Sequence, residues 1–185
     1  MFVSLLPWIG LAYMGVAWGL GFSVAKIATS GGFTPIGLAF WSSLISGVIL
    51  LGYVIIRGRS FVWTRASFKL YLTVALLGAA IPSTCFYFAA TRLPAGVLSI
   101  TVTLVPILTY ALALLLRTEL FSALRLSGVI LGAIAIFLLI GPENSLPGKG
   151  ALPWVLLACL SSLCYAIENI YIALRGISDV GAIRL

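Results

Sequence analysis

The sequence predicts an all-α fold, a polytopic transmembrane helix bundle with about six transmembrane helices. Apolar residues make up 62% of the 185 residues and charged residues only 8%, and the mean hydropathy is +1.22. A soluble domain is nearer half apolar and a quarter charged, so lipid is the expected solvent of this chain. The apolar blocks run without polar alternation, as in GVILLGYVII (47–56), which favours helices over the strands of a membrane barrel.

Six apolar blocks define the spans, each bounded by a short polar or Gly/Pro-rich connection. The first covers about residues 5–29. Because it is long and no Lys or Arg precedes it, we interpret it as a retained helix and not as a cleaved signal peptide. The others cover about residues 36–56, 70–91, 95–116, 126–141 and 151–174, and the fifth is the shortest. The connection 31–35 (GGFTP) is expected to form a tight turn, and 142–150 (PENSLPGKG) a polar loop.

Basic residues gather on one side of the predicted bundle. Eight lie on that side: Arg57, Arg59, Arg65, Lys69, Arg117, Arg125, Arg175 and Arg184. Three lie on the other: Lys26, Arg92 and Lys149. Cytoplasmic connections carry the excess of Lys and Arg, so both termini are expected in the cytoplasm and the protein in the inner or plasma membrane.

Several function classes are disfavoured by composition. The net charge of +7 is spread between apolar blocks and forms no basic, aromatic-rich segment, so no nucleic acid partner is expected. The chain has no histidine, which removes zinc–histidine sites and Ser-His-Asp triads. Cys85, Cys159 and Cys164 lie in apolar stretches without metal-ligand spacing. No metal, cofactor or Walker motif is indicated, and no nucleophile–base set suggests an enzyme.

Prolines and glycines inside the spans predict local departures from regular helix packing. Pro82 and Pro106 each remove one backbone hydrogen bond and are expected to kink or loosen their helices. For each, a functional hinge and a tolerated kink are both open. Two pairs of glycines stand four residues apart, Gly15 with Gly19 and Gly128 with Gly132. Such spacing lets helix backbones approach closely, inside the bundle or at a dimer interface.

Two charged side chains and their neighbours are candidates for function. Lys26 lies near the outer end of the first span, where it either snorkels to the headgroups or places a cation at the mouth of a cavity. Glu168 is the one acid well inside an apolar block, and an intramembrane carboxylate is costly enough to be a functional candidate by default. Its distance of about 20 Å from Trp154 puts it in the inner third of the last span, either solvated or buried. Asn169 and Tyr165 are its polar neighbours.

Five segments together resemble a known family in their order and spacing. They are WGLGFSVAK (18–26), TPIGLAFW (34–41), YFAATRLPAG (87–96), VTLVPILTYALALLLRTEL (102–120) and LSGVILGAIAIFLLIGP (126–142). The family that they resemble is the EamA-type domain of the drug/metabolite transporter superfamily. Pro106 matches the mid-helix proline of the family, and Glu119 matches the acid after its fourth helix. Trp41 stands where the family often has an arginine, which puts a role resting on that arginine in doubt.

The resemblance implies a division of the chain. Residues 5–141 would form one five-helix transmembrane repeat, and residues 151–185 the first helix of a second repeat with a cytoplasmic tail. GLGFSV (19–24) and SLCYAI (162–167) share a faint small-Leu-small-aromatic pattern. Family members have about ten helices in two inverted halves with the cavity between them. The chain is therefore expected to be half of an inverted-repeat transporter that either continues in a longer protein or pairs with another chain.

The function implied by the resemblance is secondary transport of a small organic metabolite or drug by alternating access, with export as the expected direction. The alternative is a non-transporting membrane subunit, or an inactive truncated remnant, that packs with partner helices. The expected partners are the lipid bilayer, a small-molecule substrate, and a second copy or a second half-transporter chain. The candidates for the substrate pathway are Trp18, Phe22, Lys26, Trp41, Tyr87, Pro106, Glu168 and Asn169. The aromatic members of this set either pack in the bundle or line a pocket.

Overall fold

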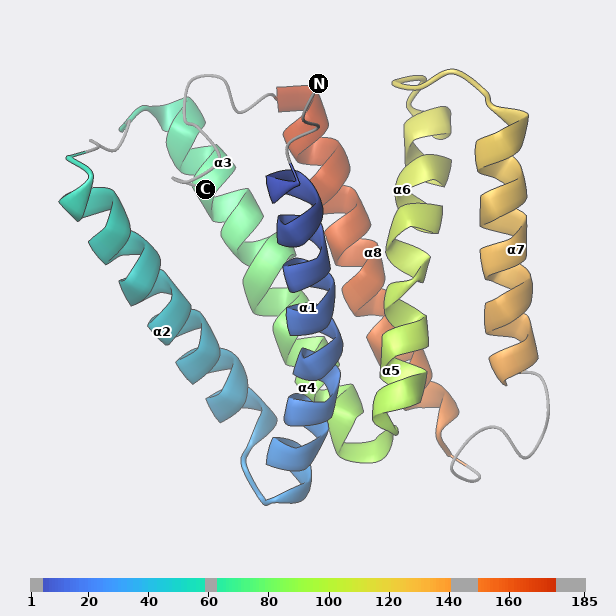
Figure 1. The fold of residues 1–185 in the computed structure, drawn as a ribbon, viewed down its shortest axis with the longest axis horizontal. Helices are drawn as coiled ribbons and strands as arrows, with labels where there is room; N and C mark the ends of the chain where they lie inside the picture. Colours follow the sequence, from blue (N-terminus) through green and yellow to red (C-terminus); the bar gives the residue numbers. More distant parts are fainter. Residues whose placement is uncertain (1–4, 59–62, 141–149, 176–185) are drawn as a thin grey trace.

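The computed structural model describes residues 5–58, 63–140 and 150–175, and in these ranges the chain is a bundle of membrane-length helices (Figure 1). Two spans are single helices near the N-terminus, α1 (Leu6–Ser30) and α2 (Pro35–Ile56). The third is α3 (Arg65–Ala75), the π-helical turn η1 (Leu76–Ala80) and α4 (Ile81–Arg92). The fourth is α5 (Ala95–Val102) with α6 (Leu104–Leu115), followed by α7 (Ala123–Ile140) and α8 (Leu152–Arg175).

These helices confirm the predicted membrane bundle. Five described spans are long and apolar enough to cross a bilayer. The apolar helix α7 is the sixth, and at 18 residues it is the shortest, as predicted. The loop predicted over 142–150 lies, apart from Gly150, outside the described residues.

The prolines account for both interruptions within spans. A proline has no N–H, so the carbonyl four residues earlier loses its α-helical partner. Four residues before Pro82 is Gly78, in the wide turn of η1, where the Ile81 N–H bonds the Leu76 carbonyl. Four residues before Pro106 is Val102, where α5 ends. The prediction that each proline loosens its helix is confirmed, and the looser backbone lies on the N-terminal side of each proline.

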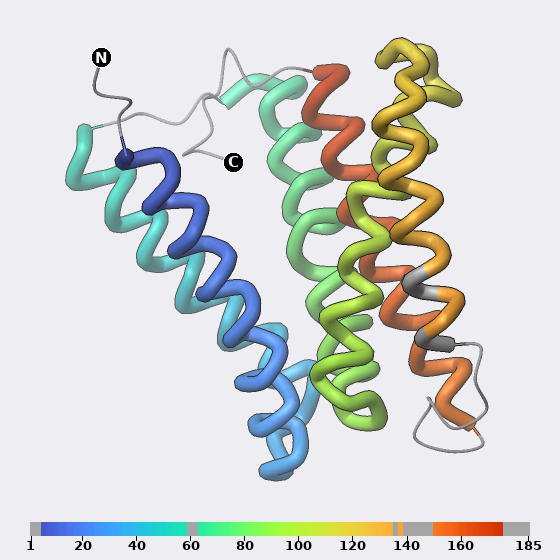
Figure 2. The backbone as a smooth tube through the Cα atoms, turned by 45° about the vertical axis from the view of Figure 1, so that its right-hand side comes forward, coloured from blue at the N-terminus to red at the C-terminus, as the bar shows by residue number. Residues whose placement is uncertain are grey.

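The bundle has two layers that diverge toward the end where the chain begins. Figure 2 shows α1 and α2, in blue and cyan, leaning away from the other helices and meeting them at the opposite end. Residues 5–21 are all exposed. The second half of α1 packs on α4 and α5, so the first half of α1 presents an apolar surface to its surroundings.

The buried core lies at the closed end of this divergence. Its members are mostly small or aliphatic: Ala89, Ala90, Leu93, Val97, Leu98, Ala151, Val155 and Ala158. They come from α4, α5 and α8 and the turns at their ends, and the alanines let these helices approach closely. Beside this core, the Arg92 guanidinium lies 5.8 Å from the Trp154 ring centroid.

The two glycine pairs differ in whether another helix lies close to them. No atom lies within 4 Å of a β-carbon built on Gly15 or Gly19, so the expected close packing of this pair inside the bundle is wrong for the described chain. Gly15 lies in the half of α1 that has no helical neighbour, and Gly19 lies on a side of α1 that faces away from α4 and α5. Gly132 does receive a neighbour, because a β-carbon there would lie 2.7 Å from Ile107 Cδ1, whereas Gly128 faces open space.

Candidate functional site

An aromatic pocket of about 230 Å³ lies where α1 diverges from the rest of the bundle. Its walls come from α1, α4, α5 and α8: Ala17, Trp18, Gly21, Phe22, Ala25, Ser83, Phe86, Tyr87, Val102 and Tyr165. Trp18 is the middle residue of α1, and Tyr165 lies near the middle of α8. The pocket is therefore near half depth in the bundle, where transporters bind their substrates.

Ring contacts connect the walls of this aromatic pocket. Centroid distances are 6.4 Å between Trp18 and Tyr165, 5.6 Å between Phe22 and Phe86, and 5.8 Å between Phe86 and Tyr87. All three pairs are tilted or edge-on, which is the favourable geometry for aromatic rings. None of the ten lining residues is charged. The pocket thus offers flat apolar faces with a few hydroxyl groups, which suits a small planar organic molecule.

The two segments with the faint internal repeat contribute to opposite walls of the aromatic pocket. Phe22 is the aromatic residue of GLGFSV on α1, and Tyr165 holds the same place in SLCYAI on α8. Both line the pocket, and Tyr165 also touches the ring of Trp18. Therefore α1, the first helix of the predicted first repeat, and α8, the predicted first helix of a second repeat, face each other at this pocket.

Glu168 lies one turn beyond Tyr165 on α8 and reaches across to the wide turn of the third span. A β-carbon built on Gly78 would lie 2.7 Å from Glu168 Oε1, 2.8 Å from Cδ and 3.1 Å from Oε2. Gly78 is at the middle of the 28-residue span Arg65–Arg92, about 20 Å from either end. The half-buried carboxylate is therefore nearer the middle of the bundle than its position on α8 predicts.

Lys26 makes a contact that neither sequence interpretation anticipated. Its Nζ donates to the Ala90 carbonyl at 2.9 Å and to the Thr91 carbonyl at 3.4 Å. The Thr29 hydroxyl lies 3.3 Å from the same Ala90 carbonyl and nearer, at 2.9 Å, to the Ala25 carbonyl of its own helix, so Lys26 is the main donor to Ala90. Carbonyls in the last turn of a helix lack intrahelical partners and carry the negative end of its dipole. Lys26 and Thr29 therefore fasten α1 to the end of α4.

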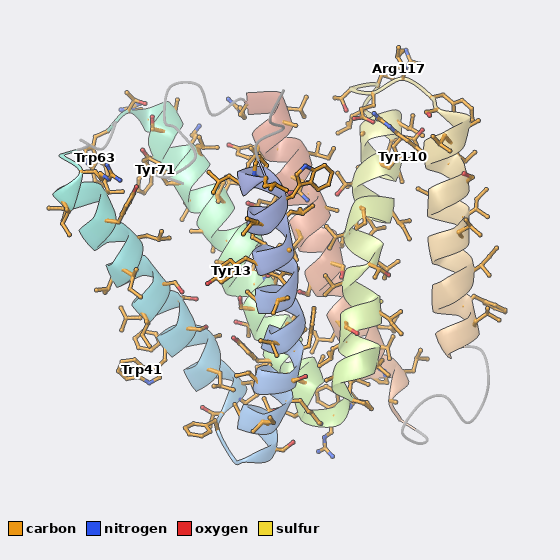
Figure 3. All side chains as sticks on the ribbon, viewed as in Figure 1. Tyr13, Trp41, Trp63, Tyr71, Tyr110 and Arg117 are labelled. Atoms are coloured by element: carbon orange, nitrogen blue, oxygen red, sulfur yellow. The ribbon has the colours of Figure 1, made fainter. Side chains whose placement is uncertain are left out.

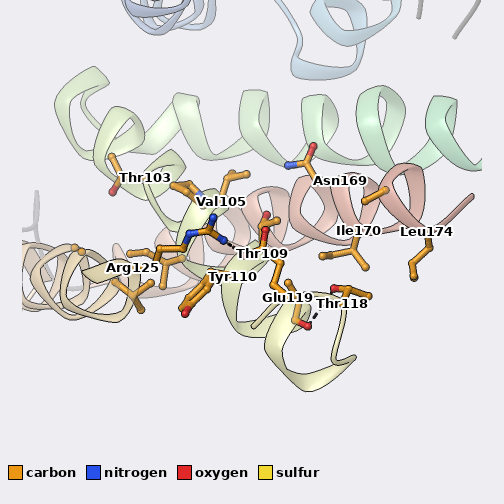
Figure 4. A pocket seen from close by; sticks show the side chains of 17 residues that line it. Thr103, Val105, Thr109, Tyr110, Thr118, Glu119, Arg125, Asn169, Ile170 and Leu174 are labelled. Atoms are coloured by element: carbon orange, nitrogen blue, oxygen red, sulfur yellow. Dashed lines mark hydrogen bonds and ion pairs between the residues drawn. The ribbon is translucent and has the colours of Figure 1, made fainter. Parts of the chain in front are cut away.

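A second cavity, a groove of about 910 Å³, lies between α6, α7 and α8 (Figure 4). Pro106 and Asn169 line it. So do Glu119 and Arg125, which form the one ion pair between described residues. The Thr109 hydroxyl is buried in the same region without a hydrogen-bond partner among the described residues. The groove holds more polar groups than the aromatic pocket, and it is lined on one side by α7.

The structure divides the predicted site residues into groups. Trp18, Phe22 and Tyr87 meet in the aromatic pocket, whereas Pro106 and Asn169 line the groove. Trp41 joins neither, since its side chain points away from the bundle (Figure 3) and is 60% exposed.

Sequence reasoning missed most of the small and polar residues that line the aromatic pocket, and it also missed Gly78 beside Glu168. Ser83 shows no signal of its own and is found only in the fold. Gly78 could have been found as the glycine four residues before an intrahelical proline, where a wide turn leaves room for a neighbouring side chain. Within the described residues no group of three or more His, Cys, Asp or Glu could hold a metal ion.

These features define an integral, multi-pass membrane protein in which two of the described spans are interrupted near prolines, beside a pocket between the helices. The chain belongs to the EamA-like transporter family, whose sequence model matches residues 6–141. This confirms the resemblance, and the family is one of membrane transporters of the drug/metabolite type and not of enzymes. Neither the curated proteins nor the solved structures give a match.

Proposed function

We propose that this chain contributes the substrate pathway of a secondary transporter that exports a small organic metabolite or drug by alternating access. The aromatic pocket is the proposed binding site. The observation that carries the proposal is the position of this pocket beside two interrupted helices. Val102, where α5 ends, lines it directly, and Gly78, in the wide turn, lies opposite the next turn of α8. Interrupted helices near the midplane are a common feature of transporter binding sites.

The arrangement in the cell is part of the same proposal. Figure 1 shows the end of α2, the start of α3, the end of α6, the start of α7 and the end of α8 at one end of the bundle. The charge count assigns this end, and both termini, to the cytoplasm of a cell with the protein in its inner or plasma membrane. A second half-transporter chain, or a second copy, would cover the exposed first half of α1 and complete the cavity.

The test measures efflux of a planar aromatic probe, ethidium, from cells that express the chain in its native assembly. We expect Trp18→Ala and Tyr165→Ala to raise the KM for ethidium on the order of ten-fold. Each removes about 1.4 kcal/mol of contact between an aromatic ring of the pocket and the bound probe. Trp41→Ala is the matched control, since it also removes a largely exposed tryptophan, but one that does not line the aromatic pocket. Equal losses in Trp18→Ala and Trp41→Ala at equal membrane abundance would contradict the proposed site. Absence of any efflux activity would favour a non-transporting subunit.

A further inference from the structure

Glu168 is the one carboxylate of the described spans that has no basic partner. The one ion pair between described residues joins Arg125 to Glu119, and no hydrogen bond to the Glu168 carboxylate is found in this part of the chain. An ionised carboxylate so placed is costly in the membrane interior, whereas its protonated form is not. The geometry therefore favours a group that changes its protonation during function.

The backbone that Glu168 meets at Gly78 would interact differently with the protonated and the ionised carboxyl group. In a regular helix the Gly78 carbonyl would accept the N–H of residue 82, which is proline and has none. A protonated Glu168 has an O–H to donate to backbone carbonyls, and an ionised Glu168 can only accept. Gly78 also leaves the space that the carboxylate occupies, because any larger residue would place a β-carbon within 2.7 Å of it.

The groups around Glu168 are mostly weak acids or neutral. On α8 they are Cys164, Tyr165 and, toward the end, Tyr171 and Arg175. The elements that pack on α8 are α4, α5, α6 and η1. From α4 come Cys85, Tyr87 and, at its far end, Arg92, and from α6 comes Tyr110. The segments η1 and α5 contribute no titratable side chain. Arg175 and Arg92 lie toward opposite ends of the bundle, so neither neutralises the carboxylate where it meets Gly78.

We propose that Glu168 binds and releases the proton that drives transport, and that its contact with the wide turn at Gly78 changes with its protonation. This inference rests on the proposed transport function. The carboxylate takes a proton from water on one side of the membrane and becomes a neutral carboxyl group. It returns the proton to water on the other side. Tyr165, one turn away, connects this change to the wall of the aromatic pocket.

The transport test uses proteoliposomes containing the native assembly, with ethidium as the probe and an imposed gradient of one pH unit. One proton exchanged per probe gives accumulation of up to about ten-fold, since a pH unit is worth about 1.4 kcal/mol. We expect this accumulation in the wild type and in Glu143→Gln, the matched control with an acid from the 142–150 connection. Glu168→Gln should exchange ethidium across the membrane without accumulating it. Wild-type accumulation by Glu168→Gln would overturn the inference.

A second measurement does not depend on transport. Infrared difference spectra of the purified protein between acidic and alkaline pH should show a carboxylic C=O band that Glu168→Gln removes and Glu143→Gln retains. Gly78→Ala should shift the pH at which this band is half-formed, because the new methyl group displaces the Glu168 carboxylate. A band that persists in Glu168→Gln, or a midpoint unmoved in Gly78→Ala, would overturn the inference. If the wild type moves no ethidium but the band titrates as expected, the proposed transport function fails and the proton site stands.

Discussion

Replacing Lys26 with methionine is expected to loosen the junction of α1 with α4. The Lys26 ammonium donates at 2.9 Å to the carbonyl of Ala90, a residue that is 0% exposed. Methionine keeps much of the apolar stem but has no donor for this carbonyl. The Thr29 hydroxyl is 3.3 Å from the same oxygen, but its hydrogen has a nearer acceptor in the Ala25 carbonyl at 2.9 Å.

The magnitude follows from the kind of bond that is lost. A hydrogen bond with one charged partner contributes about 1.5–3 kcal/mol. Because Lys26 is only partly buried, we expect the lower part of this range, about 1.5–2 kcal/mol of unfolding free energy. That corresponds to a folded-to-unfolded ratio lower by roughly ten- to thirty-fold. Lys26→Arg keeps the charge and several donors, so it should recover most of the loss.

Denaturation of the purified protein in detergent, followed by tryptophan fluorescence, measures this change. The matched control is Lys69→Met, which removes an exposed lysine of α3 with no hydrogen-bond partner in the described chain. The proposed role of Lys26 in holding α1 against α4 would be wrong in either of two cases. One is that Lys26→Met is as stable as the wild type, and the other is that Lys69→Met lowers the unfolding free energy by as much. Transport separates the two roles of Lys26. A folded Lys26→Met protein without activity would place the charge on the substrate pathway, and wild-type rates at equal abundance would refute that role.

Three further predictions test the rest of the architecture. Pro106→Ala restores a backbone donor at the α5–α6 break and should slow ethidium transport with normal membrane insertion; an unchanged rate would leave the break as a tolerated kink. Ser162→Ala should lower the unfolding free energy by about 0.6–1.7 kcal/mol, because its hydroxyl bonds the carbonyl of residue 101 at 2.9 Å. Ser161→Ala, which removes a buried hydroxyl without a partner in the described chain, should cost nothing, and equal losses would contradict this bond. Cysteine at Phe33 should react with an impermeant reagent from outside the cell and cysteine at Leu120 only after permeabilisation; the reverse would invert the assigned orientation.

The spans and their breaks were predictable because their causes are local. Apolar blocks of membrane length and a missing N–H at Pro82 or Pro106 act within a few residues of themselves. Which side chains meet was not predictable, because it depends on tilt. Trp18 and Trp41 are both largely exposed on their helices, yet the first lines the aromatic pocket and the second lines neither cavity. The meeting of Glu168 with Gly78 could not be predicted for the same reason, since its side chain reaches across to another span.

Both proline breaks receive a polar side chain from the same helix, α8. Glu168 lies against Gly78 in the wide turn that precedes Pro82, and the Ser162 hydroxyl donates to the Thr101 carbonyl beside the break that precedes Pro106. Lipid cannot satisfy backbone groups, and beside the second break the Thr101 carbonyl finds a donor in the Ser162 hydroxyl. Because both contacts belong to α8, a shift of this helix changes them together, and Tyr165 carries the same shift into the aromatic pocket. The described helix that contacts both proline breaks is therefore also a wall of the proposed binding site.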